Sequence, residues 1–466
     1  MPTNRSRRDF LWQAGGGFAG VALTHLLTQD NFWKVEAASR APHFPAKAKR
    51  AVFLFMNGAP SQVDTFDPKP ELTRRNGQAY NGALAVGSNG RPVGYLMQSP
   101  FAFQPRGKSG LEISDLFPHT ARFADDLCVI RSMYTDTAAN ASGCLQMNTG
   151  SIFLGKPSVG AWVTYGLGAE NESLPAFVVM TDPRGGPIGS ASNWTAGYMP
   201  AAYQGTLFRA TGAPLLDLRP PVDDKTQRRS LGLLKELNEQ HRAKYPDDTE
   251  LSARIQSYEL AYRMQTEAAS TVDLNQESEA TRRRYGLDET VTADFGKKCL
   301  ITRRLLEKGV RFVQLYSGGG HIEDTWDGHN DCITNHRLHA KETDKPIAAL
   351  MEDLKATGLW DETLLIWGGE FGRTPTSEGV GKPGRDHDWH GFSMWLAGAG
   401  VKGGQAIGAT DELGFAAVEE RVHVSDLHAT VLHLLGFDHT RLSWFYSGMN
   451  QRLTGVRGEV VRKVLA

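Results

Sequence analysis

The sequence predicts an α/β fold: a mostly parallel central sheet flanked by helices on both faces. Two observations lead to this class. Six short runs are apolar without alternation, which is typical of strands covered on both faces, as in a parallel sheet. Segments with the i, i+3, i+4 apolar spacing of helices lie between several of these runs, and such alternation is typical of α/β sheets with right-handed crossovers.

The predicted strands are unbroken apolar runs, rich in residues that favour β structure. In chain order they are residues 51–56, 128–130, 177–180, 312–316, 364–367 and 392–397. Runs of this length, bounded by polar or glycine-containing segments, indicate buried strands.

Four helices are predicted between and after these strands: residues 226–265 with a break near Pro246, and residues 295–308, 347–357 and 425–435. Gly358 would end the third helix, because glycine readily adopts the left-handed conformation found there. Ser425 is expected to cap the start of the fourth.

The N-terminal residues predict a signal for export. Arg7 and Arg8 directly precede a glycine-rich apolar stretch at residues 14–27, which is too short and too polar to span a membrane. Small residues such as Ala37 and Ala38 suit cleavage nearby. We therefore expect residues 1–40 to be a twin-arginine signal peptide. The twin-arginine translocase would be a partner during export of the folded chain, and the protein would be periplasmic or extracellular.

The remainder, residues 41–466, is expected to form one large domain. A glycine- and aromatic-rich loop insertion is predicted near residues 183–220, and a charged helical insertion near residues 225–290. Trp194 and Tyr203 of the loop would either stack on a sugar or pack in the interior.

Composition excludes several classes of partner. Lys and Arg total 51 against 52 Asp and Glu, a net charge of −1, so no global charge favours nucleic acid or an anionic membrane. The four cysteines are scattered without CxxC spacing, which argues against a zinc ribbon or a disulfide framework.

Polar side chains gather where the predicted strands end. Ligands of open α/β sheets bind outside the carboxyl ends of the strands, so these side chains should meet at one rim. They are Asn57 and Asp64 after the first strand, Asp327 and His329 after the fourth, Glu370 and Arg373 after the fifth, and Arg385, Asp386 and His387 before the sixth.

Four of these residues predict a metal site: Asp327, His329, Glu370 and His387. Mixed nitrogen and oxygen ligands favour Zn²⁺ or Mn²⁺, with Ca²⁺ as the oxygen-preferring alternative. Such a site supports metal-assisted hydrolysis.

Two arginines near the same rim, Arg373 and Arg385, have two interpretations. Each could clamp an oxyanion by bidentate hydrogen bonds. Each could equally form a salt bridge with the carboxylate of Glu370 or Asp386.

Several motifs together resemble the secreted family catalogued as domain of unknown function 1501. They begin at about residue 50, continue to the C-terminus, and occupy residues 55–70, 147–150, 257–261, 369–375, 384–387 and 426–430. That family is similar to sulfatases and the alkaline phosphatase superfamily, which implies a central sheet flanked by helices.

The resemblance also implies roles for individual residues. Asn57 stands where the superfamily has its first metal-binding Asp, and Glu370 stands where it has an Asp-His pair. Asp327, His329 and His387 match its Asp and His ligands. The pattern implies one reduced metal site, with a second only if Asp64 and Asp386 contribute.

The resemblance places a nucleophile at a helix N-terminus within residues 135–147. Thr137 is our candidate, with Thr135 and Ser142 as alternatives. Cys144 lacks the C-x-P-x-R context that formylglycine sulfatases need, because Gln146 and Asn148 occupy the Pro and Arg positions.

Two functions follow from the sequence. The first is an exported metal-dependent hydrolase of sulfate or phosphate esters, with saccharide esters as candidate substrates. The alternative is a non-catalytic, metal-stabilised protein that binds an anionic polysaccharide or an envelope partner. Asn57, Phe371 and Ala141, three departures from the superfamily pattern, favour the alternative.

Overall fold

The computed structural model describes residues 41–87, 90, 92–209, 223–244, 260, 263–264, 267–320, 322–377, 379 and 382–466. The predicted signal peptide and parts of both predicted insertions, residues 210–222 and 245–259, lie outside the described residues. Among the described helices, none combines the length and hydropathy needed to cross a bilayer.

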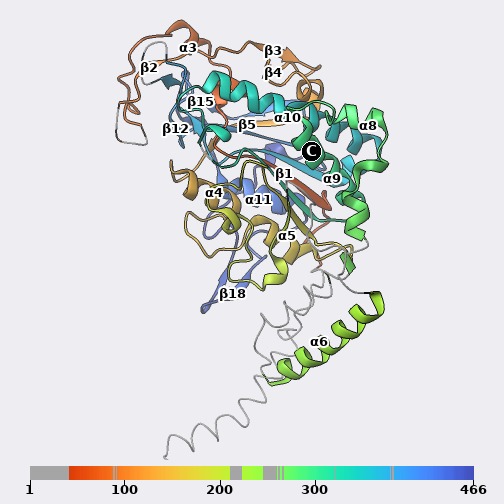
Figure 1. The fold of residues 1–466 in the computed structure, drawn as a ribbon. Helices are drawn as coiled ribbons and strands as arrows, with labels where there is room; N and C mark the ends of the chain where they lie inside the picture. Colours follow the sequence, from red (N-terminus) through yellow and green to blue (C-terminus); the bar gives the residue numbers. More distant parts are fainter. Residues whose placement is uncertain are drawn as a thin grey trace, which may run out of the picture.

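A nine-stranded sheet forms the centre of the described chain (Figure 1). Its strands pair in parallel except for β13, which runs antiparallel to both neighbours, so the predicted mostly parallel sheet is confirmed. From edge to edge the order is β14 (Gln405–Ile407), β5 (Cys128–Tyr134), β13 (Phe392–Gly398), β9 (Thr363–Gly368), β1 (Arg50–Met56), β8 (Phe312–Ser317), β6 (Phe177–Met180) and β7 (Thr206–Phe208), with β17 (Val422–His423) also on β5.

Strand β1 occupies the middle of this sheet. It pairs with β8 through Ala51 and Phe312, and with β9 through Arg50 and Thr363. All seven of its residues are buried, because alternate side chains enter two separate hydrophobic cores, one on each face.

Helices cover both faces of the sheet, as predicted (Figure 1). One core holds side chains of α4 (Asn140–Thr149), α5 (Val159–Leu167) and α11 (Val424–Leu434). The other holds side chains of α9 (Ala293–Glu307), α10 (Cys332–Ala356) and the 3₁₀ helix η1 (Thr120–Asp126).

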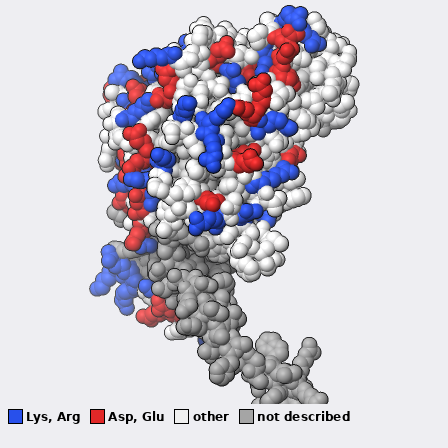
Figure 2. Space-filling view, turned by 180° about the vertical axis from the view of Figure 1, so that it is seen from behind, with Lys and Arg blue, Asp and Glu red and all other residues white. Residues whose placement is uncertain are grey.

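Other elements lie outside these layers. The further helices are α2 (Gln62–Thr65), α3 (Pro70–Arg74), α6 (Asp224–Lys244) and α8 (Glu279–Arg284). Two-stranded ladders join β3 (Phe103–Arg106) to β4 (Leu111–Ser114), β2 (Tyr95–Leu96) to β11 (Thr376–Ser377), β10 (Gly372–Arg373) to β12 (His387–Asp388), β15 (Ala409–Thr410) to β16 (Ala417–Glu419), and β18 (Trp444–Tyr446) to β19 (Met449–Gln451). Lys and Arg are interspersed with Asp and Glu on the face shown in Figure 2.

Two helices differ from the sequence prediction. Helix α10 begins at Cys332, well before the predicted start at residue 347, and accommodates Pro346 in its interior. Its N-cap is Asp331, whose side chain accepts a hydrogen bond from the Thr334 amide. Helix α11 is capped by His423 in place of Ser425, in a capping box with Asp426.

The predicted loop insertion has more structure than expected. Its described part contains two 3₁₀ helices, η2 (Ser190–Asn193) and η3 (Ala201–Tyr203), and the strand β7, which extends the main sheet. Trp194 and Tyr203 are buried, with relative exposures of 7% and 5%, and pack near Tyr316 and Tyr165. Of the two predicted roles, packing in the interior is therefore the one that both side chains have.

Candidate metal centre

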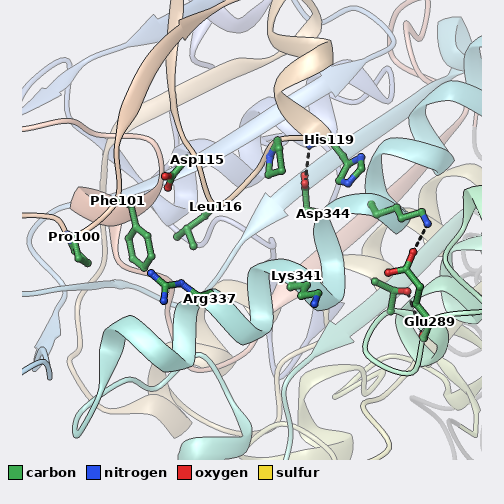
Figure 3. Close-up of a pocket in the computed structure, with 12 residues that line it drawn as sticks. Pro100, Phe101, Asp115, Leu116, His119, Glu289, Arg337, Lys341 and Asp344 are labelled. Carbon is green, nitrogen blue, oxygen red and sulfur yellow. Dashed lines mark hydrogen bonds and ion pairs between the residues drawn. The ribbon is translucent and has the colours of Figure 1, made fainter.

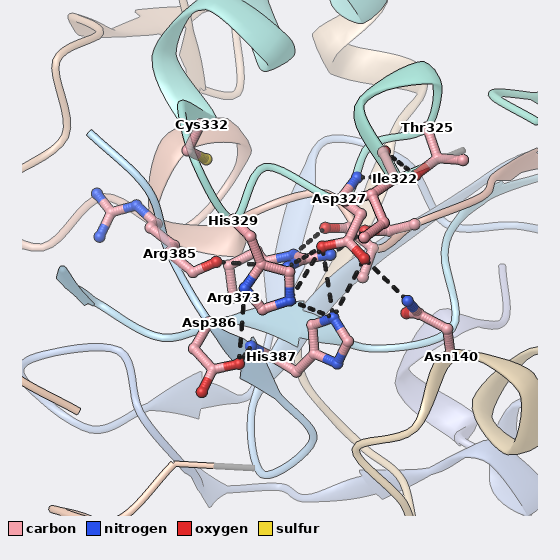
Figure 4. A network of polar contacts seen from close by, with 12 residues as sticks. Asn140, Ile322, Thr325, Asp327, His329, Cys332, Arg373, Arg385, Asp386 and His387 are labelled. Atoms are coloured by element: carbon pink, nitrogen blue, oxygen red, sulfur yellow. Dashed lines mark hydrogen bonds and ion pairs between the residues drawn. The ribbon is translucent and has the colours of Figure 1, made fainter. Parts of the chain in front are cut away.

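Three of the predicted ligands meet at the carboxyl rim of the sheet: Asp327, His329 and His387. One ligand atom from each lies within 4.8 Å of the others (Figure 4). Asp327 and His329 belong to the segment that follows β8. His387 begins β12, directly opposite Arg373 of β10. Because β13 runs antiparallel, the segment entering it reaches the same rim as the segments leaving β1, β8 and β9.

Gly58 allows the segment that follows β1 to approach the segment that follows β8 and carries Asp327. Its φ is +102°, and a Cβ there would lie 2.6 Å from the Asp327 amide nitrogen and 2.7 Å from that of Trp326. The neighbouring Asn57 carbonyl accepts a hydrogen bond from the Trp326 amide at 2.8 Å. Only glycine fits this contact without displacing the Asp327 backbone.

The spacing of the donor atoms fits a divalent cation. The Nε2 atoms of His329 and His387 are 3.0 Å apart, and they lie 3.3 and 3.4 Å, respectively, from Asp327 Oδ1. Ligands of a tetrahedral zinc ion, at about 2.0–2.1 Å from the metal, are separated by roughly 3.3 Å.

The outer nitrogens of both imidazoles face acceptors. His387 Nδ1 lies 2.6 Å from the carbonyl of Ala138, and His329 Nδ1 lies 3.8 Å from Asp386 Oδ1. With Nδ1–H directed outward, each Nε2 presents a lone pair to the centre, as in metal-ligating histidines. Burial, with help from Arg373, lowers the pKa of His329 and favours the neutral ring that a metal needs.

Arg373 lies directly behind Asp327 and is fully buried. Its Nη1 is 2.6 Å from Asp327 Oδ1, its Nε donates to the Ala59 carbonyl, and its Nη2 donates to the Gly58 carbonyl. Burial opposes ionisation of Asp327, but Arg373 and the two imidazoles outweigh it and hold the pKa of that carboxyl well below its usual range.

Arg385 also faces internal acceptors. Its Nε and Nη2 contact the two carboxylate oxygens of Asp64 at 2.7 and 3.1 Å, and it donates to the carbonyls of Met97 and Thr374. Of the two predicted roles, both arginines have the internal salt bridge. Their partners, however, are Asp327 and Asp64 in place of the predicted Glu370 and Asp386.

Glu370 lies outside the three-residue group. Its carboxylate oxygens accept the Gly58 amide at 2.9 and 3.2 Å, and burial raises its pKa to about 7. Asn57 is beside it, with its amide oxygen 3.5 Å from Cys144 Sγ. Burial and the proximity of Glu370 raise the pKa of the Cys144 thiol well above its usual value.

The remaining predicted residues are spread around the centre. Asp64 is held by Arg385, whereas Asp386 accepts the His387 amide at 2.7 Å and faces His329. Thr137 is half-buried, and its hydroxyl accepts the Ala139 amide at 3.2 Å just before α4. Within the part of the chain that the structure describes, these side chains form no second group of three closely spaced metal ligands.

Asn140, which the sequence did not single out, also belongs to the centre. It begins α4, and its Nδ2 donates to Asp327 Oδ2 at 2.9 Å (Figure 4). Its amide oxygen is buried without a partner among the described residues. The contact brings the first turn of α4, where helices leave N–H groups without intrahelical partners, next to the candidate ligands.

A separate hollow of about 480 Å³ lies along the outward face of α10 (Figure 3). Arg337, Lys341 and Lys345 of α10 line it together with Phe101 and His119. It shares no lining residue with the Asp327, His329 and His387 group.

Comparisons with known proteins give one family and several distant structures. The family model described as "Protein of unknown function (DUF1501)" matches residues 48–465. Curated protein sequences give no match.

Three solved structures illustrate the structural matches. The lipoteichoic acid synthase LtaP from Listeria monocytogenes has a TM-score of 0.36 and 11% identity, over 92% of this chain and 80% of that chain. A 2-O GAG sulfatase named BT1596 has a TM-score of 0.39 and 8% identity, over 90% of this chain and 74% of that chain. The phosphonate monoester hydrolase SpPMH from Silicibacter pomeroyi has a TM-score of 0.33 and 13% identity, over 75% of this chain and 71% of that chain. Likenesses this weak assign neither an activity nor a site.

Proposed function

The chain belongs to the family described as protein of unknown function DUF1501, and we propose that it is a metal-dependent hydrolase of phosphate or sulfate esters. One observation carries the proposal. Two imidazole Nε2 atoms 3.0 Å apart converge with a carboxylate at the rim of the sheet, with their outer nitrogens directed at acceptors.

Asp327, His329 and His387 would hold the ion. Two nitrogen donors favour Zn²⁺ or Mn²⁺ over Ca²⁺, and Arg373 already offsets the one carboxylate charge, which further disfavours a hard, oxygen-seeking cation. A divalent ion held there supplies Lewis acidity toward an ester oxygen or a water molecule.

The surrounding residues would position these ligands and the substrate. The Ala138 carbonyl would orient the His387 ring, Asp386 faces the His329 ring, and Arg373 holds Asp327. The first turn of α4 offers N–H groups and the positive end of the helix dipole to an anionic ester.

Roles for three further residues are part of the proposal. Thr137 is proposed as the nucleophile, because it lies in the segment that delivers the Ala138 carbonyl to His387. Arg373 and Arg385 are proposed to act by holding Asp327 and Asp64, since their donors face internal acceptors.

We propose a saccharide ester as the substrate type. The proposed compartment is the periplasm or the outside of the cell. The compartment rests on Arg7 and Arg8 of the predicted signal peptide. The second candidate function is a non-catalytic metal-stabilised binding protein. It is favoured by Asn140, because an amide that cannot act as a nucleophile starts the helix beside Asp327.

Metal analysis of His387→Ala tests the site, with His433→Ala on α11 as the matched control. The wild type and the control should bind one ion per chain at limiting metal, whereas His387→Ala should lose it. Full stoichiometric metal in His387→Ala would show that the ligands are assigned wrongly.

A panel of aryl phosphates, phosphodiesters and sulfates with Zn²⁺, Mn²⁺ and Ca²⁺ tests the activity. Metal-dependent turnover that His387→Ala abolishes is expected. No turnover on any ester, together with saturable binding of an anionic glycan, would favour the binding protein.

A further inference from the structure

The β18–β19 hairpin carries large apolar side chains into solvent. Phe445, Tyr446 and Met449 have relative exposures of 60%, 48% and 60%. Their two strands form a separate ladder, not part of the main sheet, and β18 projects from the body of the protein (Figure 1). Exposed apolar side chains gathered on one projection mark an interaction site more often than single ones do.

The hairpin is a rigid support for these side chains. Its two turn residues, Ser447 and Gly448, have φ angles of +51° and +83°. Positive φ at both positions is typical of the type I′ turn, whose twist matches that of paired strands. Next to the turn, Tyr446 stacks on Tyr198 with ring centroids 4.8 Å apart.

The exposed side chains lie on both faces of the hairpin. Tyr446 pairs with Met449 across the strands, and Phe445 pairs with Asn450. Successive strand residues point to opposite faces, so Phe445 is on one face and the Tyr446–Met449 pair on the other. Tyr198 holds the Tyr446 ring, so Phe445 and Met449, each 60% exposed, are the apolar side chains free to enter a lipid layer from the two faces.

Two arginines flank the hairpin at the end away from its turn. Arg441 precedes β18 and Arg452 follows β19. Neither forms an ion pair with a carboxylate among the residues that the structure describes. Basic residues next to an inserted apolar segment bind anionic headgroups, each contributing about 1 kcal/mol near the surface.

We propose that the β18–β19 hairpin docks the protein on an anionic lipid surface, with Phe445 and Met449 inserted and Arg441 and Arg452 at the headgroups. This surface is independent of the metal centre and adds a peripheral lipid contact to the proposed hydrolase.

A probe at the tip of the hairpin tests the location of the contact. The four native cysteines are buried, so Ser447→Cys in the full chain can be labelled selectively with an environment-sensitive fluorophore. Ser109→Cys, on the exposed turn between β3 and β4, is the matched control. Vesicles of phosphatidylcholine with 30% phosphatidylglycerol should shift the Ser447→Cys emission to the blue and leave the control unchanged.

Sedimentation with the same vesicles measures the affinity. Phe445→Ser/Met449→Ser should bind at least tenfold more weakly than the wild type. Val418→Ser/Ile322→Ser, which removes exposed apolar side chains elsewhere, should bind like the wild type. Pure phosphatidylcholine should bind the wild type more weakly than the anionic mixture.

Two outcomes would overturn the proposal. One is equal vesicle binding by the wild type and Phe445→Ser/Met449→Ser. The other is a tip-probe shift that follows protein concentration without lipid, which would assign the hairpin to self-association.

Discussion

Replacing Arg385 with methionine should destabilise the protein strongly, because it leaves a buried carboxylate without its partner. Asp64 and Arg385 are each 1% exposed, so solvent screens their interaction little. Removing one member of a buried pair typically costs about 3–5 kcal/mol. The carbonyls of Met97 and Thr374, which accept hydrogen bonds from Arg385, would also lose their donor.

The cost should depend on pH in a defined direction. Burial opposes ionisation of Asp64, but Arg385 outweighs it and lowers the pKa of Asp64 below 3.8. In the wild type this stability is therefore present above about pH 4 and is lost as pH falls through the lowered value. In Arg385→Met, burial dominates and raises the pKa of Asp64. The difference between the two proteins should thus be largest near pH 7 and shrink toward pH 4.

Urea unfolding of metal-free protein at pH 7.5 and pH 5 measures this difference. Asp64→Asn/Arg385→Met should recover part of the loss, because the unpaired charge is gone. Arg457→Met is the control, since Arg457 pairs with Asp136 while its side chain is 60% exposed, and such surface pairs contribute about 0–1 kcal/mol. Suppose instead that Arg385→Met costs less than about 1 kcal/mol and abolishes ester turnover. Arg385 would then be an oxyanion clamp, and the buried-pair reasoning would be wrong.

Three further outcomes are expected. Changing both Arg7 and Arg8 to Lys should leave the precursor in the cytoplasm, and a periplasmic yield equal to wild type in fractionated cells would contradict the predicted signal. In metal-free protein, burial raises the pKa of Glu370 from 4.5 to about 7, so folding stability should fall as pH rises through that interval, and Glu370→Gln should flatten this slope in urea titrations. Cys144→Ser should retain ester turnover, because a hydroxyl can still donate to Asn57 and no formylglycine is expected; loss of turnover with unchanged metal content would reopen a role for the thiol.

The strands could be predicted because both of their faces are covered, which leaves an unbroken apolar run. The same reasoning misses α5, since Val159–Leu167 is buried on every side and shows no polar face to reveal a helical period. It also misses the first half of α10, because Pro346 and many polar residues interrupt the apolar pattern.

The site could be predicted only to the extent that strand ends determine it. Asp327, His329 and His387 come together because the segment that follows β8 and the segment that enters β13 meet at one rim. Glu370 stays apart because the Gly58 amide satisfies its carboxylate, and no spacing in the sequence reveals that hydrogen bond. The contact of Asn140 with Asp327 likewise depends on where α4 begins in space.

The central position of β1 has a consequence for how the chain reaches its folded state. Its partners β8 and β9 follow it by about 260 and 310 residues, so the first strand made is among the last to be completed. At the usual 5–20 residues per second, synthesis of that interval takes roughly 15–60 s. Pairings this distant in sequence also form slowly once the chain is free. Until then an apolar strand with two open edges is exposed to aggregation. A translocase that accepts folded proteins, as Arg7 and Arg8 predict, would give this sheet time to close before it leaves the cytoplasm.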